Sequence, residues 1–465
     1  MLSSTCTDDP HRCGTAVLGG GPAGLSVAYH LRKLGGSSHI FEAGATLGGA
    51  CQTKEFQGFR YDMGAHRLHN VFPEVTEEVR ALLKDEIATV RAPSHIYHQG
   101  KPVPFPPSPQ GLARALGFWK MAASVAPVLL SPPRRGDNFR DDAIAKYGRL
   151  AAESFLVNYS EKLWGLPAEQ LAVAISGKRL QGLGLKSTLR SLVGLKQGEH
   201  LDGAFLYPKR GFGQITDALA NRVDHVHMNA RVEKLLHEGG EINAIVLSDG
   251  RRFDIQRAVS TLPIQALIHS LDPRPPRDIL ELASSLRFRS VRLAILIVDA
   301  ASLSRSASLY FPCARVPFTR VYEPKQRSSA MAPADQTCLV LEYAVFPGDA
   351  IDSLSSEEFL ALSRRSLAST GLLREAAVIG GTVDRVQDAY PVLDIDAARR
   401  LARVNAYLQR FTNLHRIGRA AHFRYSHFHD LMREGRLLAE QLAPLSRPSE
   451  RGESVVSPSA VAWSA

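Results

Sequence analysis

The chain has 465 residues, too many for one compact domain of ordinary size, so its length predicts two or three lobes. Because 45% of the residues are hydrophobic and 22% charged, we expect a folded globular protein rather than a disordered one. The formal net charge of +10 suits an anionic partner. Lysine and arginine are scattered without a basic block, however, which argues against nucleic-acid binding and leaves a peripheral membrane contact open.

The cysteines and the apolar runs indicate where the protein works. Five cysteines, an odd number, are widely spread without a CxxC pair, which favours a reducing compartment over a disulfide scaffold or a zinc site. The first residues lack the basic-then-apolar order of a signal peptide, and no apolar run approaches the roughly 20 residues of a membrane-spanning helix. We therefore expect a cytoplasmic protein without a transmembrane segment; a homo-oligomer stays open.

The first predicted elements follow a strand, helix, strand order. Residues 16–18 form a short buried strand, residues 24–34 a helix with one apolar face, and residues 39–41 the next strand. This order is typical of the start of a Rossmann-type unit.

A GxGxxG motif, Gly19, Gly21 and Gly24, lies between that strand and helix. In this context the glycines allow a tight turn, close approach of the backbone to a pyrophosphate, and close packing of helix on strand. Glu42 follows the second strand, where a carboxylate accepts hydrogen bonds from the ribose hydroxyls and disfavours a ribose phosphate. The motif predicts a dinucleotide other than NADP, and by itself leaves NAD and FAD open.

Later elements predict a second lobe. Helical patterns over residues 73–83 and 141–156 flank a proline-dense loop at 101–110, and apolar alternation returns at 223–236, 242–247 and 253–261. Residues 286–299 read as a strand of a second sheet, and two further helices are expected at 397–409 and 427–442.

These elements predict an α/β fold in which a discontinuous, Rossmann-type FAD-binding domain carries an inserted mixed α+β substrate domain. We assign residues 14–72, 203–263 and 405–445 to the FAD-binding domain, and residues 73–202 and 264–404 to the substrate-binding and helical regions. Residues 446–465, rich in serine and proline, are expected to be a disordered tail.

Two features favour FAD. Gly48 and Gly49 closely follow Glu42, which suits an extended dinucleotide whose far end runs into the protein, and the segment YDMGAHRLHN follows another short strand. No second GxGxxG follows a strand, which argues against a built-in NAD(P)H domain.

With these residues assembled, the chain resembles the flavoprotein group that contains protoporphyrinogen oxidase, monoamine oxidases, phytoene desaturases and UDP-galactopyranose mutase. The resemblance rests on GGGPAGL, YDMGAHRLHN, YPKRGFGQITDALA, RAVSTLP and the C-terminal NLHRIGRAAHFRYSHFHDLMREG. It implies that FAD is contacted by Gly19, Gly21, Pro22, Ala23, Gly24, Glu42, Gly48, Gly49, Gly64, Ala65, His66, Val232, Gly418, Arg419 and Tyr425.

Within the group, the pattern is nearest to UDP-galactopyranose mutase and its oxidase-like bacterial relatives. NYSEKLWG, VPFTRVYEPK and AYPVLD are similar to segments of the mutase, and the match implies a substrate site made of Trp164, Arg179, Arg320 and Tyr390. The segments SVRLAILIVD and PSHIYHQGKPVPFP are more similar to the oxidase-like relatives.

Each site residue has a plainer alternative. Arg320 matches a diphosphate in shape and charge, but it could be a sheet-edge arginine paired with Glu323. Trp164 could belong to the core, and the direction of the Tyr390 ring is not set by sequence. His66 fits a hydrogen bond beside the flavin or a structural role, and we expect no metal site there or among His422, His427 and His429.

Three functions follow from these predictions. In the first, a FAD-dependent oxidoreductase takes hydride from a small, anionic substrate onto flavin N5, and the supporting catalytic candidates are His66 and Tyr390. The second is a mutase-like isomerase acting on a sugar nucleotide through reduced FAD. The third, a flavin-binding scaffold without turnover, has the weakest support because every expected cofactor segment is present.

Overall fold

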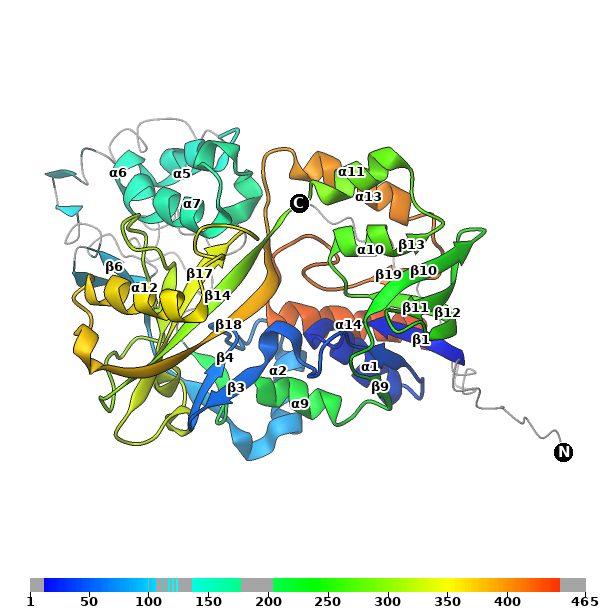
Figure 1. Cartoon of the computed structure of the whole chain (residues 1–465), viewed down its shortest axis with the longest axis horizontal. Helices are drawn as coiled ribbons and strands as arrows, with labels where there is room; N and C mark the ends of the chain where they lie inside the picture. Colours follow the sequence, from blue (N-terminus) through cyan, green and yellow to red (C-terminus); the bar gives the residue numbers. More distant parts are fainter. Residues whose placement is uncertain are drawn as a thin grey trace, which may run out of the picture.

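A computed structural model describes residues 12–98, 100–105, 136–176 and 204–443, together with a few single positions between 111 and 123. In these ranges two large sheets occupy opposite halves of the molecule, and helices pack on both (Figure 1). Parallel and antiparallel pairs occur together, so the fold is mixed α/β, in agreement with the predicted class.

The larger sheet combines segments that are far apart in the sequence. Its strand order is β13, β10, β11, β12, β1, β2, β9, and β19 also pairs with β12. β1 (Arg12–Leu18) pairs in parallel with β2 and β12, and β2 pairs in parallel with β9. The other bounds are β2 His39–Phe41, β9 His225–His227, β10 Val232–Glu238, β11 Glu241–Leu247, β12 Arg252–Ser260, β13 Leu271–Asp272 and β19 Leu414–Arg416.

Helices cover both faces of this sheet, because successive side chains of a strand point to opposite sides. Val17 packs with α1, α2, α9 and α14, whereas Ala16 and Leu18 pack with α10, α11 and α13. The bounds are α1 Pro22–Lys33, α2 Pro73–Leu83, α9 Gly213–Ala220, α10 Ile264–Ser270, α11 Arg277–Ser284, α13 Ala397–Leu408 and α14 Phe428–Leu442. β1 is thus buried on both sides, as its apolar sequence predicts.

The second sheet has the order β18, β14, β17, β16, β15, β6, β7. Helix α12 (Ser356–Ala368) packs on one face, and the hairpin of β3 (Thr53–Phe56) and β4 (Phe59–Asp62) packs on the other. The bounds are β6 Ser94–His98, β7 Lys101–Phe105, β14 Phe288–Val298, β15 Ser308–Tyr310, β16 Arg320–Tyr322, β17 Thr337–Val345 and β18 Val378–Pro391; β5 (Ile87–Val90) pairs separately with β8 (Phe205–Pro208).

A group of short helices lies beside this sheet in the left half of Figure 1: α5 (Phe139–Tyr147), α6 (Arg149–Ala151) and α7 (Asn158–Trp164). The turn between α6 and α7, Ala152–Val157, is a π-helix. Such π-helical turns occur frequently at functional sites.

Most sequence-predicted elements are confirmed, and two differ for clear reasons. The helix expected at 141–156 is interrupted at Gly148, whose φ of +79° does not fit an α-helix. The proline-dense loop expected at 101–110 begins as strand β7, which lies at the edge of its sheet. An edge strand tolerates Pro102 and Pro104, because proline lacks only the amide proton that faces away from the sheet. None of the helices in the described ranges has the length and apolarity needed to cross a membrane.

Candidate functional site

In the turn from β1 into α1, the packing of neighbouring atoms requires glycine at positions 19 and 24. Gly19 has a φ of +109°, and a Cβ there would lie 2.2 Å from Thr261 Oγ1. A Cβ on Gly24 would lie 2.0 Å from the Gly19 carbonyl oxygen. A larger residue would therefore collide with the Thr261 side chain at position 19, where the positive φ also disfavours it, and with backbone at position 24.

Gly21 differs, because no neighbouring protein atom requires a glycine at this position. Its φ of −74° suits any residue, and a Cβ would find only Gly49 Cα, at 4.0 Å. The space in front of Gly21 is open at the start of α1, where Pro22 occupies the first turn without a capping side chain or an acidic residue. Free backbone N–H groups and the positive end of the helix dipole suit a pyrophosphate there. The cradle therefore fits the diphosphate of a dinucleotide.

Glu42 lies next to this turn. Its carboxylate accepts hydrogen bonds from the Gly20 N–H and the Gly44 N–H, both at 2.8 Å. The Glu42 carbonyl accepts the Ala230 N–H at 2.8 Å, which brings the segment leading to Val232 beside it. Gly48 N–H donates to the Gly20 carbonyl, and a Cβ on Gly418 would lie 3.2 Å from Ala23 Cβ. The structure thus brings the N-terminal, middle and C-terminal predicted segments to one place.

Three of the residues predicted to contact FAD, Gly64, Ala65 and His66, follow β4. His66 Nε2 lies 2.7 Å from the Ala50 carbonyl oxygen, and burial lowers the pKa of His66 to about 3. The ring is therefore neutral at physiological pH, and Nε2 carries the proton that the carbonyl accepts. The Ala65 N–H donates to Glu342 Oε1 at 3.1 Å, which ties the segment to β17 of the second sheet.

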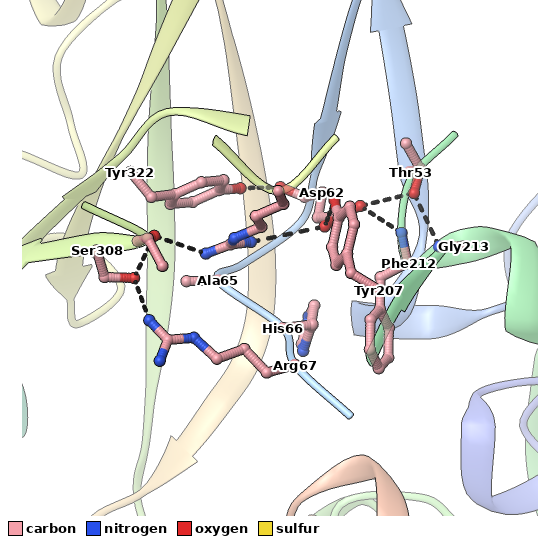
Figure 2. Close-up of polar contacts among 12 residues, drawn as sticks. Thr53, Asp62, Ala65, His66, Arg67, Tyr207, Phe212, Gly213, Ser308 and Tyr322 are labelled. Atoms are coloured by element: carbon pink, nitrogen blue, oxygen red, sulfur yellow. Dashed lines mark hydrogen bonds and ion pairs between the residues drawn. The ribbon is translucent and has the colours of Figure 1, made fainter. Parts of the chain in front are cut away.

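A buried carboxylate, Asp62, anchors this segment (Figure 2). It accepts hydrogen bonds from Tyr207 OH at 2.6 Å, Thr53 Oγ1 at 2.7 Å and the Phe212 N–H at 2.9 Å. Its Oδ2 lies 3.8 Å from Nη1 of Arg327, whose side chain is fully buried. Burial raises the pKa of Asp62, and the Arg327 charge and the three hydrogen bonds oppose that rise. Asp62 thus joins the β3–β4 hairpin, the loop before α9 and the end of the second sheet.

Four predicted residues meet where the two halves of the molecule face each other. Trp164, at the end of α7, contacts Tyr390 edge to face with ring centres 5.9 Å apart. Tyr390 lies nearly parallel to Tyr425, with centres 6.0 Å apart. The Arg419 guanidinium lies 4.5 Å from the Tyr425 ring centre and donates to the carbonyls of Ala389 and Ser426. The sequence places Trp164 and Tyr390 in the substrate site and Tyr425 and Arg419 in the cofactor site, so the two predicted sites adjoin.

A bulge in β18 accounts for the position of Tyr390. Arg289 pairs with Tyr390 and Val291 with Val386, so β18 contains extra residues here, and Asp388 takes a φ of +48°. Bulges next to functional sites redirect neighbouring side chains.

Arg320 is not paired with Glu323, the alternative considered from sequence. It binds the Glu342 carboxylate through Nε to Oε2 at 2.9 Å and through Nη2 to Oε1 at 2.8 Å and Oε2 at 2.6 Å. Glu323 instead accepts the Ser304 N–H and the Thr337 hydroxyl. Burial lowers the pKa of Arg320, but the Glu342 charge and nearby tyrosines raise it well above its usual value, so it stays charged.

Sequence reasoning missed several residues in this region. Two of them are Tyr310 and Tyr159, which together with the predicted Tyr390 lie close enough to Arg320 to raise its pKa. Arg289 is buried on β14, donates to the Ala344 carbonyl and stacks on Phe346 at 4.4 Å. The signal for Arg289 was the arginine within the apolar strand pattern LRFRSVRLAILIVD, because a charged residue inside a buried strand needs a specific reason.

The remaining predicted residues have plain positions. Arg179 and the tail at 446–465 lie outside the described residues. His427 caps α14 together with Asp430, and His422 pairs with Glu434 at 3.0 Å. In the part of the chain that the structure describes, no group of three or more histidine, cysteine or acidic residues is arranged to hold a metal ion.

Comparison with solved structures gives the same fold. Reduced UDP-galactopyranose mutase superposes with a TM-score of 0.80 at 18% identity, covering 92% of this chain and 93% of the mutase. A protein from Exiguobacterium sp. 255-15, provisionally described as a protoporphyrinogen oxidase, gives 0.74 at 18% identity over 95% of this chain and 99% of its own. Putrescine oxidase bound to putrescine gives 0.64 at 17% identity, over 93% and 99%.

The family assignment rests on the sequence match. Residues 22–394 match the family described as flavin-containing amine oxidoreductases, a span that begins directly after Gly21 and contains Gly24, Glu42 and the residues around Arg320. The open cradle at Gly21 and the carboxylate of Glu42 fit the family's cofactor. The chain therefore belongs to the flavin-containing amine oxidoreductases, and its cofactor is FAD.

Proposed function

We propose that the protein is a FAD-dependent oxidoreductase that takes hydride from a small, anionic substrate. In this proposal residues 14–72, 203–263 and 405–445, which carry most strands of the eight-stranded sheet, form the Rossmann-type FAD-binding domain. The regions 73–202 and 264–404 hold the substrate. The residues expected to hold FAD are the separate positions named in the sequence analysis, of which Gly19 is the first and Tyr425 the last.

The observation that carries the proposal is the charge around the aromatic cluster. Arg320 and Arg419 bring two guanidinium groups to Tyr390, and Glu342 is the carboxylate bonded to Arg320. A buried cationic site disfavours an ammonium substrate and favours carboxylate or phosphate oxygens, for which the planar guanidinium is well shaped. This charge argues against a simple amine, although the family takes its name from amines.

The chain's own residues position the substrate. Burial raises the pKa of Tyr390 to about 12, so its hydroxyl keeps its proton and can donate to an anion. Trp164 and Tyr425 offer ring faces on either side of Tyr390 and exclude water. FAD, when bound, supplies the hydride acceptor.

One observation favours a second candidate, an isomerase of sugar nucleotides. Trp164, Arg320 and Tyr390 were selected by their similarity to mutase segments, and the fold brings Trp164 and Tyr390 into contact beside Arg320. Such an enzyme would use the same cationic site for a diphosphate, with no net transfer of electrons.

Anaerobic incubation of the holoprotein separates the two candidates. We expect an anionic substrate such as a porphyrinogen to bleach the oxidised flavin. Conversion of UDP-galactopyranose only after dithionite reduction, without electron consumption, would instead establish the isomerase. Bleaching by putrescine and by neither anionic probe would contradict both.

Substitution of Tyr390 tests the assigned site. Tyr390→Phe removes one hydroxyl and keeps the ring, so the substrate loses one hydrogen bond worth about 1 kcal/mol and binds roughly fivefold to tenfold more weakly. Titration calorimetry with UDP measures the dissociation constant. Tyr407→Phe on α13 is the matched control and leaves it unchanged. Equal effects of the two variants would remove Tyr390 from the site. Arg320→Ala is less informative, because it leaves Glu342 buried without its partner.

A further inference from the structure

Lys162 makes an unusual set of contacts at the edge of the site. Its Nζ donates to the backbone carbonyls of Phe311 at 2.6 Å, Val316 at 2.6 Å, Cys313 at 2.8 Å and Phe318 at 3.1 Å. An ammonium group has three protons, so one of them is shared between two carbonyls. The loop between β15 and β16 therefore wraps around one cation supplied by α7.

The two parts that Lys162 joins carry opposite sides of the proposed substrate site. α7 carries Tyr159 and Trp164 in addition to Lys162. The base of the loop is the cross-strand pair of Tyr310 and Arg320. Tyr159 and Tyr310 meet edge to face with ring centres 5.8 Å apart. The distance between Trp164 on α7 and Arg320 at the base of the loop thus depends on how α7 packs against this loop.

We propose that Lys162 is a positioning residue of the substrate site, whose ammonium group holds α7 against the loop between β15 and β16. The proposal rests on the proposed function, because it takes the substrate to lie between Trp164 and Arg320. Lys162 itself need not contact the substrate, since its N–H groups already donate hydrogen bonds to the loop carbonyls.

The contact between Lys162 and the loop carbonyls depends on the positive charge of the ammonium group. Four carbonyl oxygens that converge on one point repel one another unless a cation lies between them, and an apolar side chain would leave them unsatisfied. Burial lowers the pKa of Lys162 to about 8, so the group is a cation at neutral pH and loses its charge as the pH rises above that value. The titratable group on the loop that faces it is Cys313, which in turn lies close to Arg315.

The test uses the FAD-loaded, full-length protein with Lys162→Met. We expect amide hydrogen exchange over residues 311–319 to become about tenfold faster and UDP to bind about tenfold more weakly, while FAD content stays the same. Lys234→Met, which removes an exposed lysine paired with Asp272 on the other sheet, is the control and changes neither quantity. Unchanged loop exchange or unchanged UDP affinity in Lys162→Met overturns the proposal.

A pH profile of the wild type gives a second readout that does not require the variant to fold. We expect its UDP affinity to fall as the pH rises through about 8, with the same profile in Cys313→Ser. Where Lys162→Met folds, dividing its UDP dissociation constant by that of the wild type at each pH cancels the titration of UDP itself. This ratio should approach one at high pH, because Lys162 is then uncharged in the wild type. A flat profile overturns the proposal. If the wild type binds no UDP at any pH, the sugar-nucleotide candidate fails, whereas loop exchange still decides whether Lys162 holds the loop.

Discussion

Gly21→Ala is expected to abolish tight FAD binding while leaving the apoprotein folded. A Cβ at this position meets only Gly49 Cα at an ordinary distance of 4.0 Å, so the polypeptide itself accommodates it. The methyl group instead fills the space where the backbone must approach the pyrophosphate. A loss on the order of 3 kcal/mol, about a hundredfold in affinity, is expected. Fluorescence titration of apoprotein with FAD measures it, and the melting temperature of the apoprotein should not move.

Gly14→Ala is the matched control. Gly14 lies on β1, is exposed, and a Cβ there would lie 3.7 Å from Gln256 Oε1. It should leave both FAD affinity and melting temperature unchanged. If Gly21→Ala binds FAD as tightly as the wild type does, the open space in front of Gly21 is not the diphosphate site.

Asp62→Asn is expected to cost the largest share of folding stability. The amide keeps the shape of the side chain but removes the charge opposite Arg327, whose side chain is fully buried. It also presents an N–H₂ group to a place where the Tyr207 hydroxyl and the Phe212 N–H both donate. Removing one partner of a buried pair costs about 3–5 kcal/mol. Urea denaturation of the apoprotein measures the free energy of unfolding independently of FAD.

An exposed ion pair supplies the comparison for that prediction. Asp254→Asn breaks a pair with Arg252 in which both side chains are more than half exposed. Exposed pairs contribute about 0–1 kcal/mol, so this variant should unfold close to the wild type. A similarly small effect in Asp62→Asn would show that the buried network around Arg327 does not depend on the carboxylate.

The sequence predicts local arrangements well because neighbouring residues determine them. The spacing of Gly19, Gly21, Gly24 and Glu42 fixes a turn, a helix start and a strand end within about thirty residues, and all three appear where expected. The apolar periodicity of α2 and β14 likewise predicts their bounds closely. These features follow from short-range geometry.

Pairings between distant segments could not be read from the sequence in the same way. Glu323 is three residues from Arg320 and was the natural candidate partner, but the tertiary fold brings Glu342 of β17 opposite it. Nothing in the sequence around Lys162 indicates that the loop from Phe311 to Phe318 surrounds its ammonium group. The orientation of the Tyr390 side chain depends on a bulge in β18, and no glycine or other turn residue in the sequence predicts that bulge. In each case the deciding contact joins elements more than fifteen residues apart, where periodicity carries no information.

The central claim is that a flavin and an anionic substrate meet beside Trp164, Arg320 and Tyr390. Visible difference spectroscopy of the oxidised holoprotein tests it directly, because a ligand next to the isoalloxazine ring perturbs its absorbance. Titration with UDP-galactopyranose should give a saturable change that is weakened in Tyr390→Phe, and putrescine should give none. A saturable change with putrescine and none with the sugar nucleotide would contradict the account.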